Sequence, residues 1–310
     1  MVLSLFLLVL GFVLLVKGAD FFVDGASAIA RRFGIPQLVI GLTIVAMGTS
    51  APEAAVSITA AVRGNADITI GNIVGSNILN ILIILGLSSV VAPLAVTVPT
   101  LFRDIPFMIG ITLLLLFQGT GGSVGFWEGM VLTLLFLAYL GYLLWAAQKD
   151  GKELAAASAE GKKLSLWTAL LGTAAGLVMI VVGSHTAVDA ATNLARLFGM
   201  SERFIGLTIV ALGTSLPELF TSVSAAAKGN AEIAIGNIVG SNIFNILFVV
   251  GVSALITPVP FSAEFYADMW IAAAAGVLLL ACSVKGRKLG RRGGIAMLAG
   301  YVLYFVFICL

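Results

Sequence analysis

Charged residues are scarce in this chain: Asp, Glu, Lys and Arg make up only 10% of its 310 residues, and hydrophobic residues make up 60%. Soluble domains carry about 25% charged residues, so this composition excludes a soluble protein. The longest polar run, residues 148–163, is too short to form a hydrophobic core. Apolar stretches long enough to cross a bilayer recur along the chain, which predicts an all-α integral membrane protein surrounded by lipid.

Histidine and cysteine are also scarce. The chain has one histidine, His185, and two cysteines, Cys282 and Cys309, which lie in apolar stretches and are expected to be small buried hydrophobes. There is no P-loop, zinc-ligand spacing or nucleophile elbow, so the sequence predicts neither an enzyme nor a bound cofactor. A net charge of +2 carries no signature of nucleic-acid binding.

The hydropathy pattern predicts ten membrane spans. Residues 1–16 lack a basic n-region and continue into further apolar segments, so they are interpreted as the first span and not as a signal peptide. The expected spans are near 3–23, 37–62, 67–92, 100–118, 126–147, 165–190, 202–227, 232–257, 265–284 and 290–309.

Two phrases occur twice in the chain, 165 residues apart. Residues 41–53 (GLTIVAMGTSAPE) recur as 206–218 (GLTIVALGTSLPE), and residues 64–80 (GNADITIGNIVGSNILN) recur as 229–245 (GNAEIAIGNIVGSNIFN). Upstream positions recur at the same offset, among them Gly18, Asp24 and Arg31. The chain is therefore predicted to contain two five-helix repeats, 1–147 and 164–310, joined by the linker 148–163. Because five is odd, the second repeat enters the membrane upside down, and the repeated phrases meet near the midplane.

Loop charges predict the orientation of this inverted pair. Thirteen basic residues fall on one side: Arg31, Arg32, Arg103, Lys149, Lys152, Lys162, Lys163, Lys228, Lys285, Arg287, Lys288, Arg291 and Arg292. Three fall on the other: Arg63, Arg196 and Arg203. The richer side is expected to be cytoplasmic, which places both termini outside the cytoplasm in a cell membrane.

Each copy of the first phrase places a proline beside a carboxylate within a span. Pro52 lacks a backbone N–H and clashes with the carbonyl four residues earlier, so it is expected to break the helix and free carbonyls near Gly48. Thr49, Ser50 and Glu53 add hydroxyl and carboxylate oxygens, which together predict a site for a hard cation. The second repeat has the same set: Gly213, Thr214, Ser215, Pro217 and Glu218.

The second phrase forms a polar stripe with a spacing of four residues. Asn72, Ser76 and Asn80 share one helix face, and Gly71 and Gly75 let another helix approach closely. The equivalent residues are Asn237, Ser241, Asn245, Gly236 and Gly240. The stripe is expected to pack against the broken helix and complete an ion shell, although intramembrane asparagine can also serve only to join helices.

Other polar residues have less specific interpretations. A single buried glutamate could be a protonated structural residue, but duplication of the whole motif favours a functional pair. His185 is interpreted as a packing or rim residue, with proton sensing as the alternative. Asp24 and Asp189 are expected to pair with nearby arginines at helix ends, and the acids Asp67 and Glu232 suit the start of a helix.

The duplicated GTSxPE and GNxxGSNxxN motifs resemble the paired repeats of the sodium/calcium exchangers, within the cation/calcium antiporter superfamily. The resemblance covers essentially the whole chain. It implies four central cation sites, with the carboxylates of Glu53 and Glu218 shared by Ca²⁺ and Na⁺. The implied carbonyl ligands are those of Thr49, Thr214, Ala46 and Ala211, and the implied hydroxyl ligands for Na⁺ are those of Ser50, Ser215, Ser76 and Ser241. Asn80 and Asn245 form the remaining central pair. Some relatives, including potassium-dependent exchangers, have Asp at the position of Asn245, so this chain is expected not to need K⁺.

The sequence therefore predicts a monomeric secondary-active antiporter that exchanges Na⁺ for Ca²⁺ and extrudes Ca²⁺ by alternating access. A proton/calcium antiporter is the close alternative, since two glutamates can take two protons. A cation channel is a third, because broken helices and acids also suit a pore. The duplicated hydroxyl and carbonyl ligands favour sodium, and the inverted repeat argues against a channel.

Overall fold

The fold was analysed in a computed structural model, which describes residues 1–64, 66–157, 165–200 and 211–309. The first repeat contains α1 (Val2–Phe33), α2 (Gln37–Ile40), η1 (Gly41–Val45), α3 (Ala46–Thr49), α4 (Ala51–Val62), α5 (Asp67–Leu79), η2 (Asn80–Leu85), α6 (Gly86–Val91), β1 (Leu94–Ala95), η3 (Thr100–Asp104), α7 (Ile105–Gln118), η4 (Gly119–Gly121), β2 (Ser123–Val124) and α8 (Phe126–Ala157).

The second repeat follows the same order. It contains α9 (Leu166–Leu197), α11 (Ala211–Thr214), α12 (Leu216–Ala227), α13 (Ala231–Phe244), η6 (Asn245–Val250), α14 (Gly251–Ile256), β3 (Val259–Pro260), α15 (Phe265–Val284), η7 (Lys285–Arg287), β4 (Lys288–Leu289) and α16 (Arg291–Cys309). The segments η1, η2, η3 and η6 are π-helical, and η4 and η7 are 3₁₀-helical.

The described helices account for the expected membrane spans. Eight are long and apolar enough to cross a bilayer, and a ninth span is formed by the bent pair Gln37–Thr49 and Ala51–Val62. The seventh expected span, 202–227, is described only from Ala211, because residues 202–210 lie outside the described part. The protein is therefore an all-α membrane protein of ten spans in two inverted five-helix repeats.

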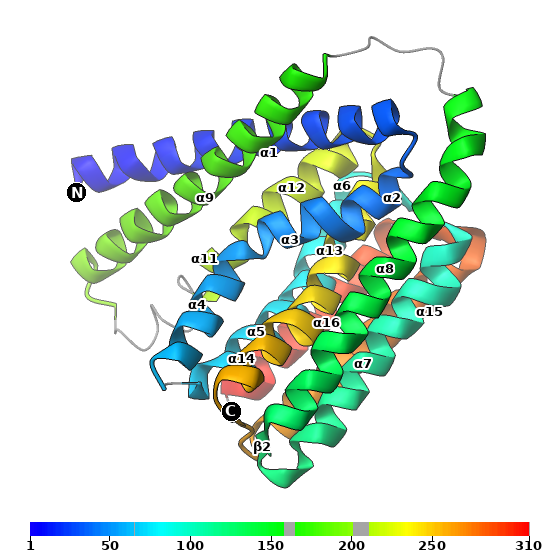
Figure 1. Ribbon diagram of the computed structural model, residues 1–310. Coiled ribbons are helices and arrows are strands. Elements are labelled where there is room, and N and C mark those ends of the chain that lie inside the picture. Colours follow the sequence, from blue (N-terminus) through cyan, green and yellow to red (C-terminus); the bar gives the residue numbers. More distant parts are fainter. Residues whose placement is uncertain (65, 158–164, 201–210, 310) are drawn as a thin grey trace.

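The first helices of the two repeats show the inversion directly. α1 and α9 lie side by side and run in opposite directions (Figure 1), with Gly11 against Ala187 and Gly25 against Ala169. At the crossing, a Cβ on Gly18 would come within 2.9 Å of the Gly176 carbonyl oxygen. Because equivalent helices of a parallel repeat would run the same way, this antiparallel pair requires an inverted one.

The two repeats are also joined through short strands. β1 pairs with β4 in the register Leu94↔Leu289, and β2 pairs with β3 in the register Ser123↔Pro260. The offset of 165 residues converts each of these two-stranded sheets into the other. Each repeat therefore supplies one strand to each sheet, so neither sheet forms within a single repeat.

Two helices are longer than the sequence predicts. The first and sixth spans were expected to end near residues 23 and 190, but α1 continues to Phe33 and α9 to Leu197. Helix-favouring alanines continue through 26–30 in α1 and through 190–195 in α9. In α1 no helix-terminating residue occurs until Gly34, which takes a left-handed φ of 63°. α8 likewise runs into the predicted linker as far as Ala157, and residues 158–163 lie outside the described part.

A buried cation-type site between the two broken helices

The sequence predicts a break near Gly48 and its counterpart Gly213, and in the structure each break lies two residues later, at Ser50 and Ser215. Ser50 separates α3 from α4 with φ −84° and ψ 6°, and Ser215 separates α11 from α12 with φ −88° and ψ 2°. Across the first break the helix axis bends by 52°. Pro52 and Pro217 lie in the first turn after each break, where a missing N–H leaves no hydrogen bond unmade. The prolines thus define where each second half-helix begins.

Each glutamate lies just past its break, in the first turn of α4 or α12. Glu53 and Glu218 are both only 1% exposed, and their carboxylates are close enough to repel each other. Each is held by the opposite repeat: the Ser50 hydroxyl donates to Glu218 Oε1 at 2.7 Å, and Thr214 hydrogen-bonds the Glu53 carboxylate. Two acidic side chains are thereby brought together although 165 residues separate them in the chain.

Asn237 connects the two broken helices across the site. Its Nδ2 donates to Ser222 Oγ at 2.9 Å and approaches the Glu218 carbonyl at 3.5 Å, while its Oδ1 accepts from the Thr49 hydroxyl at 3.0 Å. In the other repeat, Asn72 Nδ2 likewise donates to Ser57 Oγ at 2.9 Å. These amides are therefore engaged in joining helices, as the alternative interpretation of the polar stripe allowed.

Four further asparagines form a reciprocal network at the centre. Asn77 Nδ2 donates to the Asn242 carbonyl at 3.3 Å, and Asn242 Nδ2 donates to the Asn77 carbonyl at 3.2 Å. Asn80 Nδ2 donates to Asn242 Oδ1 at 3.0 Å, and Asn245 Nδ2 donates to Asn77 Oδ1 at 3.1 Å. Every bond has its counterpart under the 165-residue offset, so the pseudo-two-fold axis passes through this network.

Buried oxygens without a hydrogen-bond donor gather on these same residues. Within the described part of the chain they include Glu53 Oε2, Glu218 Oε2, Asn80 Oδ1, Asn245 Oδ1 and Ser215 Oγ. A buried polar atom that lacks a partner costs free energy, so native proteins rarely keep several together. Carboxylate, amide and hydroxyl oxygens are the ligands that hard cations prefer, and this set is rich in acceptors. Its chemistry is that of a cation site.

The remaining predicted ligands are Ser76, Ser241, Ala46 and Ala211. Ser76 and Ser241 are buried, and the Ser241 hydroxyl donates to the Ala46 carbonyl at 3.4 Å. The Ala46 carbonyl also accepts from Ser50 N at 3.0 Å, so it already has hydrogen-bond donors. Ala211 begins α11, and its side chain lies outside the described part.

Sequence analysis missed Asn77 and Asn242, which lie one position after the serine of the polar stripe. Both asparagines are repeated within the second phrase, so the sequence did mark them. They do not follow the spacing of four residues that defines the polar stripe, and they were therefore not predicted as site residues. Among the described residues, no group of three or more His, Cys, Asp and Glu lies together. The site therefore combines two carboxylates with amide and hydroxyl oxygens.

Predictions for two kinds of acidic residue outside the site have different outcomes. Among the described residues Asp24 pairs with Lys228 and not with the arginines of its own helix: Lys228 Nζ lies 2.8 Å from Asp24 Oδ1 and 3.2 Å from Asp20 Oδ1. Asp67 begins α5 and Glu232 lies in the first turn of α13, as predicted for acids at helix starts. Glu232 Oε2 also accepts from Leu38 N at 3.2 Å, near the start of α2 in the other repeat. For Asp24, a contact between repeats replaces the local pairing that the sequence predicts.

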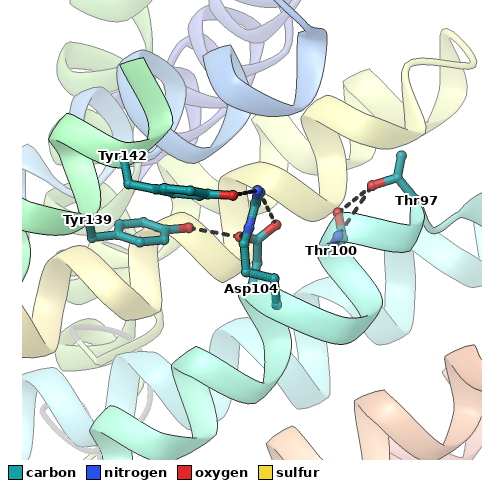
Figure 2. Close-up of polar contacts among 6 residues, drawn as sticks. Thr97, Thr100, Asp104, Tyr139 and Tyr142 are labelled. Carbon is teal, nitrogen blue, oxygen red and sulfur yellow. Dashed lines mark hydrogen bonds and ion pairs between the residues drawn. The ribbon is translucent and has the colours of Figure 1, made fainter. Parts of the chain in front are cut away.

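A second polar cluster, in which Asp104 and Tyr139 are buried, lies at the start of the fourth span (Figure 2). Arg103 Nε and Nη2 contact the two Asp104 carboxylate oxygens at 2.7 and 3.0 Å, and Arg103 Nη1 donates to the Tyr142 hydroxyl at 2.9 Å. The Tyr139 hydroxyl donates to Asp104 Oδ1 at 3.3 Å. Because the Arg103 and Asp104 charges neutralise each other and are hydrogen-bonded, this cluster fastens η3 to α8 and is not a second ion site.

The two ends of the molecule differ in how the long helix pair packs. α1 packs along α12, where Ser224 Oγ donates to Asp20 Oδ1 at 2.8 Å beside the Lys228 ion pairs. Among the described residues α9 has no comparable packing on α4, and residues of α4 line an open groove of about 450 Å³. Val56 in the groove is 44% exposed, whereas its counterpart Thr221 is 0% exposed. Inverted repeats in different conformations produce such an asymmetry.

Ten spans in inverted repeats, with broken helices meeting at a buried acidic pair, define a membrane transporter of the inverted-repeat class. The family model for the sodium/calcium exchanger protein matches residues 3–145 and 168–310. The chain belongs to this sodium/calcium exchanger family.

Individual relatives are similar over nearly their whole length. CaxA, a candidate antiporter of Alkalimonas amylolytica, is 43% identical over 98% of both chains, and the sodium/calcium exchanger MaX1 of Methanosarcina acetivorans is 33% identical over 97% of both. A solved structure of the sodium-calcium exchanger NCX_Mj superposes with a TM-score of 0.87 at 32% identity, covering 99% of both chains. The match therefore includes both repeats and the site between them.

Proposed function

We propose that this protein is a secondary-active antiporter that exchanges Na⁺ for Ca²⁺ at the site between the two broken helices. The observation that supports it best is the set of buried acceptor oxygens without donors on Glu53, Glu218, Asn80 and Asn245. These oxygens need a cation, and they lie where the inverted repeats meet. The names of relatives in the same family agree with this choice of ions.

The two glutamates supply the charge that the transported ions share. One Ca²⁺ neutralises both carboxylates, and so do two Na⁺. Two bare carboxylates at membrane depth are costly, so the carrier without ions resists the change between its inward- and outward-facing states. Exchange without leak follows from that resistance. A third Na⁺ would leave one positive charge moving per cycle, coupled to voltage at about 2.3 kcal/mol per 100 mV.

The remaining ligands are assigned by resemblance to the exchanger family. The hydroxyls of Ser50, Ser215, Ser76 and Ser241 would bind Na⁺, the carbonyls of Thr49 and Thr214 would bind either ion, and the carbonyls of Ala46 and Ala211 would be further ligands. For Ala46 this role requires its carbonyl to exchange a hydrogen bond for the ion, since Ser50 N and Ser241 Oγ now bond it. Asn80 and Asn245 complete the centre.

Alternating access would exchange the packing at the two ends of the molecule. In this structure α1 is fastened to α12, and the groove beside α4 is open. Inverted symmetry gives the opposite state, in which α9 fills the α4 groove and α1 leaves α12. The thirteen-to-three distribution of basic residues assigns the Lys228 end to the cytoplasm and both termini to the outside of a cell membrane.

Flux in liposomes tests the proposal. Purified protein in vesicles loaded with NaCl should take up Ca²⁺ when diluted into Na⁺-free buffer at equal pH, and potassium should not be required. A proton gradient without sodium should drive little uptake. Uptake that follows the proton gradient and ignores sodium would identify the proton/calcium alternative, and Ca²⁺ flux without any counter-ion would identify a channel.

A further inference from the structure

The central network determines which end of each asparagine amide can face the ion site. An asparagine amide has a donor end, Nδ2, and an acceptor end, Oδ1. The donor ends of Asn77 and Asn242 are used by each other's backbone carbonyls at 3.3 and 3.2 Å. Only their Oδ1 atoms remain available to the neighbouring amides, so this part of the network is fixed by the backbone.

The orientation of Asn80 and Asn245 follows from that constraint. Each must turn its Nδ2 toward an Oδ1 atom of the pair, at 3.0 Å to Asn242 and 3.1 Å to Asn77. Their own Oδ1 atoms therefore point the other way, where both are buried without a donor among the described residues. All four side chains are at most 4% exposed, so water does not compete for these bonds.

This orientation matters because the amides lie beside helices that carry carboxylates. η2, which begins at Asn80, packs against α12, and η6, which begins at Asn245, packs against α4. A freely rotating amide in such a place would turn its Nδ2 toward the strongest acceptor, an ionised carboxylate. That contact would satisfy the glutamate with an internal donor and present N–H groups to an arriving cation.

We propose that Asn77 and Asn242 are positioning residues that hold the amides of Asn245 and Asn80 with their oxygens toward the transported cation. The inference rests on the proposed function, because it assigns these oxygens to the same ion site. The two positioning residues do not touch the ion. They act by occupying the donor ends of the amides that do, and they thereby keep the empty site from being closed by its own hydrogen bonds.

Equilibrium Ca²⁺ binding to the purified full-length protein, measured by calorimetry without any ion gradient, tests the inference separately from sodium coupling. Asn77→Leu keeps the branched shape and heavy-atom number of the side chain but removes the acceptor for Asn245, and Asn242→Leu does the same for Asn80. Each should raise the Kd for Ca²⁺ about tenfold, the size of one good polar interaction. If the leucine does not fold, Asn77→Ala removes the same acceptor without filling space.

A double-mutant cycle distinguishes positioning from general structural damage. In an Asn245→Ala background there is no amide to orient, so adding Asn77→Leu should leave the Kd of that background unchanged within twofold. In an Asn245→Asp background both side-chain oxygens are equivalent, so Asn77→Leu should again fail to raise the Kd. A structural defect would raise the Kd in all three backgrounds by a similar factor.

Thr69→Ala provides the matched control. Thr69 lies on α5 two turns before Asn77, is fully buried, and has a hydroxyl without a partner, while the second repeat has Ala234 at this position. Its Kd should remain that of the unmodified protein. The inference is wrong if Asn77→Leu keeps the original Kd, or if it raises the Kd as much in the Asn245→Ala background as alone. Absent sodium-driven flux with intact Ca²⁺ binding would reject the proposed function and not this inference.

Discussion

At the scale of single residues, the site depends on duplication. One intramembrane glutamate could be neutral and structural, but Glu53 and Glu218 each receive a hydrogen bond from the opposite repeat, and each keeps one oxygen without a donor. The two carboxylates repel each other at membrane depth. A divalent cation, or two monovalent ones, is the group that removes this repulsion.

Replacement of either glutamate by glutamine should separate folding from transport. Glu53→Gln or Glu218→Gln removes one of two negative charges, so Ca²⁺ uptake in liposomes should fall at least a hundredfold while the protein elutes as a normal monodisperse species. Thermal unfolding gives a second measurement: Ca²⁺ should raise the Tm of the unmodified protein and leave that of the variants nearly unchanged, because ligands stabilise the state that binds them. Near-normal uptake in either variant would remove that residue from the site.

At the scale of single residues, the sequence predicts those site residues whose own chemistry disturbs a membrane helix. Glu53, Glu218 and the presence of a helix break beside each of them could be predicted, because proline and carboxylate have strong local consequences in lipid, although the breaks lie at Ser50 and Ser215, two residues after Gly48 and Gly213. Asn77 and Asn242 could not, because their function depends on an amide orientation that only the assembled repeats define. The partner of Asp24 was unpredictable for the same reason, since Lys228 lies 204 residues away.

At the scale of elements, the broken helices depend on their prolines. Pro52 stands in the first turn of α4, and Ser50 takes φ and ψ values outside the regular helix. π-helical segments lie in the same spans, with η1 before α3 and η2 and η6 beginning at Asn80 and Asn245. Such irregular turns are frequent at functional sites, because they redirect side chains without ending a helix.

Pro52→Ala should restore a backbone donor and let α3 and α4 join into a straighter helix. In the joined helix position 52 would be interior, where proline would cost about 3 kcal/mol and alanine is tolerated, so the variant should unfold at the same or a higher temperature while its Ca²⁺ uptake falls about tenfold or more. Scanning fluorimetry and liposome flux measure the two effects on one preparation. Loss of uptake together with a clearly lower Tm would contradict this explanation, since proline would then be stabilising the fold.

At the scale of the whole molecule, the two repeats are related by inverted symmetry but pack differently at the two ends. The antiparallel α1–α9 pair and the reciprocal strands were predictable in outline, because five spans per repeat require inversion. The lengths of α1 and α9 were not, since an alanine-rich helix continues past the lipid without a sequence signal. The difference between the two ends could not be predicted either, because near-identical repeats carry no information about which end is closed.

Cross-linking should detect the exchange of contacts between the two ends. With Cys282 and Cys309 replaced by serine, the pair Asp24→Cys and Lys228→Cys should be joined by a short bifunctional thiol reagent in the state described here, and the cross-link should block uptake. The equivalent pair, Asp189→Cys and Arg63→Cys, should be joined only in the opposite state. Cross-linking of both pairs in one molecule at the same time would contradict alternating access.

Labelling tests the orientation of the whole chain. A cysteine at Ser158, with Cys282 and Cys309 replaced by serine, should react with a membrane-impermeant maleimide only after cells are opened, because the basic linker is expected to be cytoplasmic. A cysteine added after Leu310 should react in intact cells. Reversed accessibility of the two cysteines would place the Lys228 end outside.

Competition between the two ions at equilibrium tests the central claim most directly. If Ca²⁺ and Na⁺ share Glu53 and Glu218, the Kd for Ca²⁺, measured by calorimetry on purified protein in choline-balanced NaCl, should rise at least with the square of the Na⁺ concentration. It should not change with K⁺, and Glu53→Gln should show neither tight Ca²⁺ binding nor the sodium effect. A Kd for Ca²⁺ that is independent of Na⁺ would contradict the shared site.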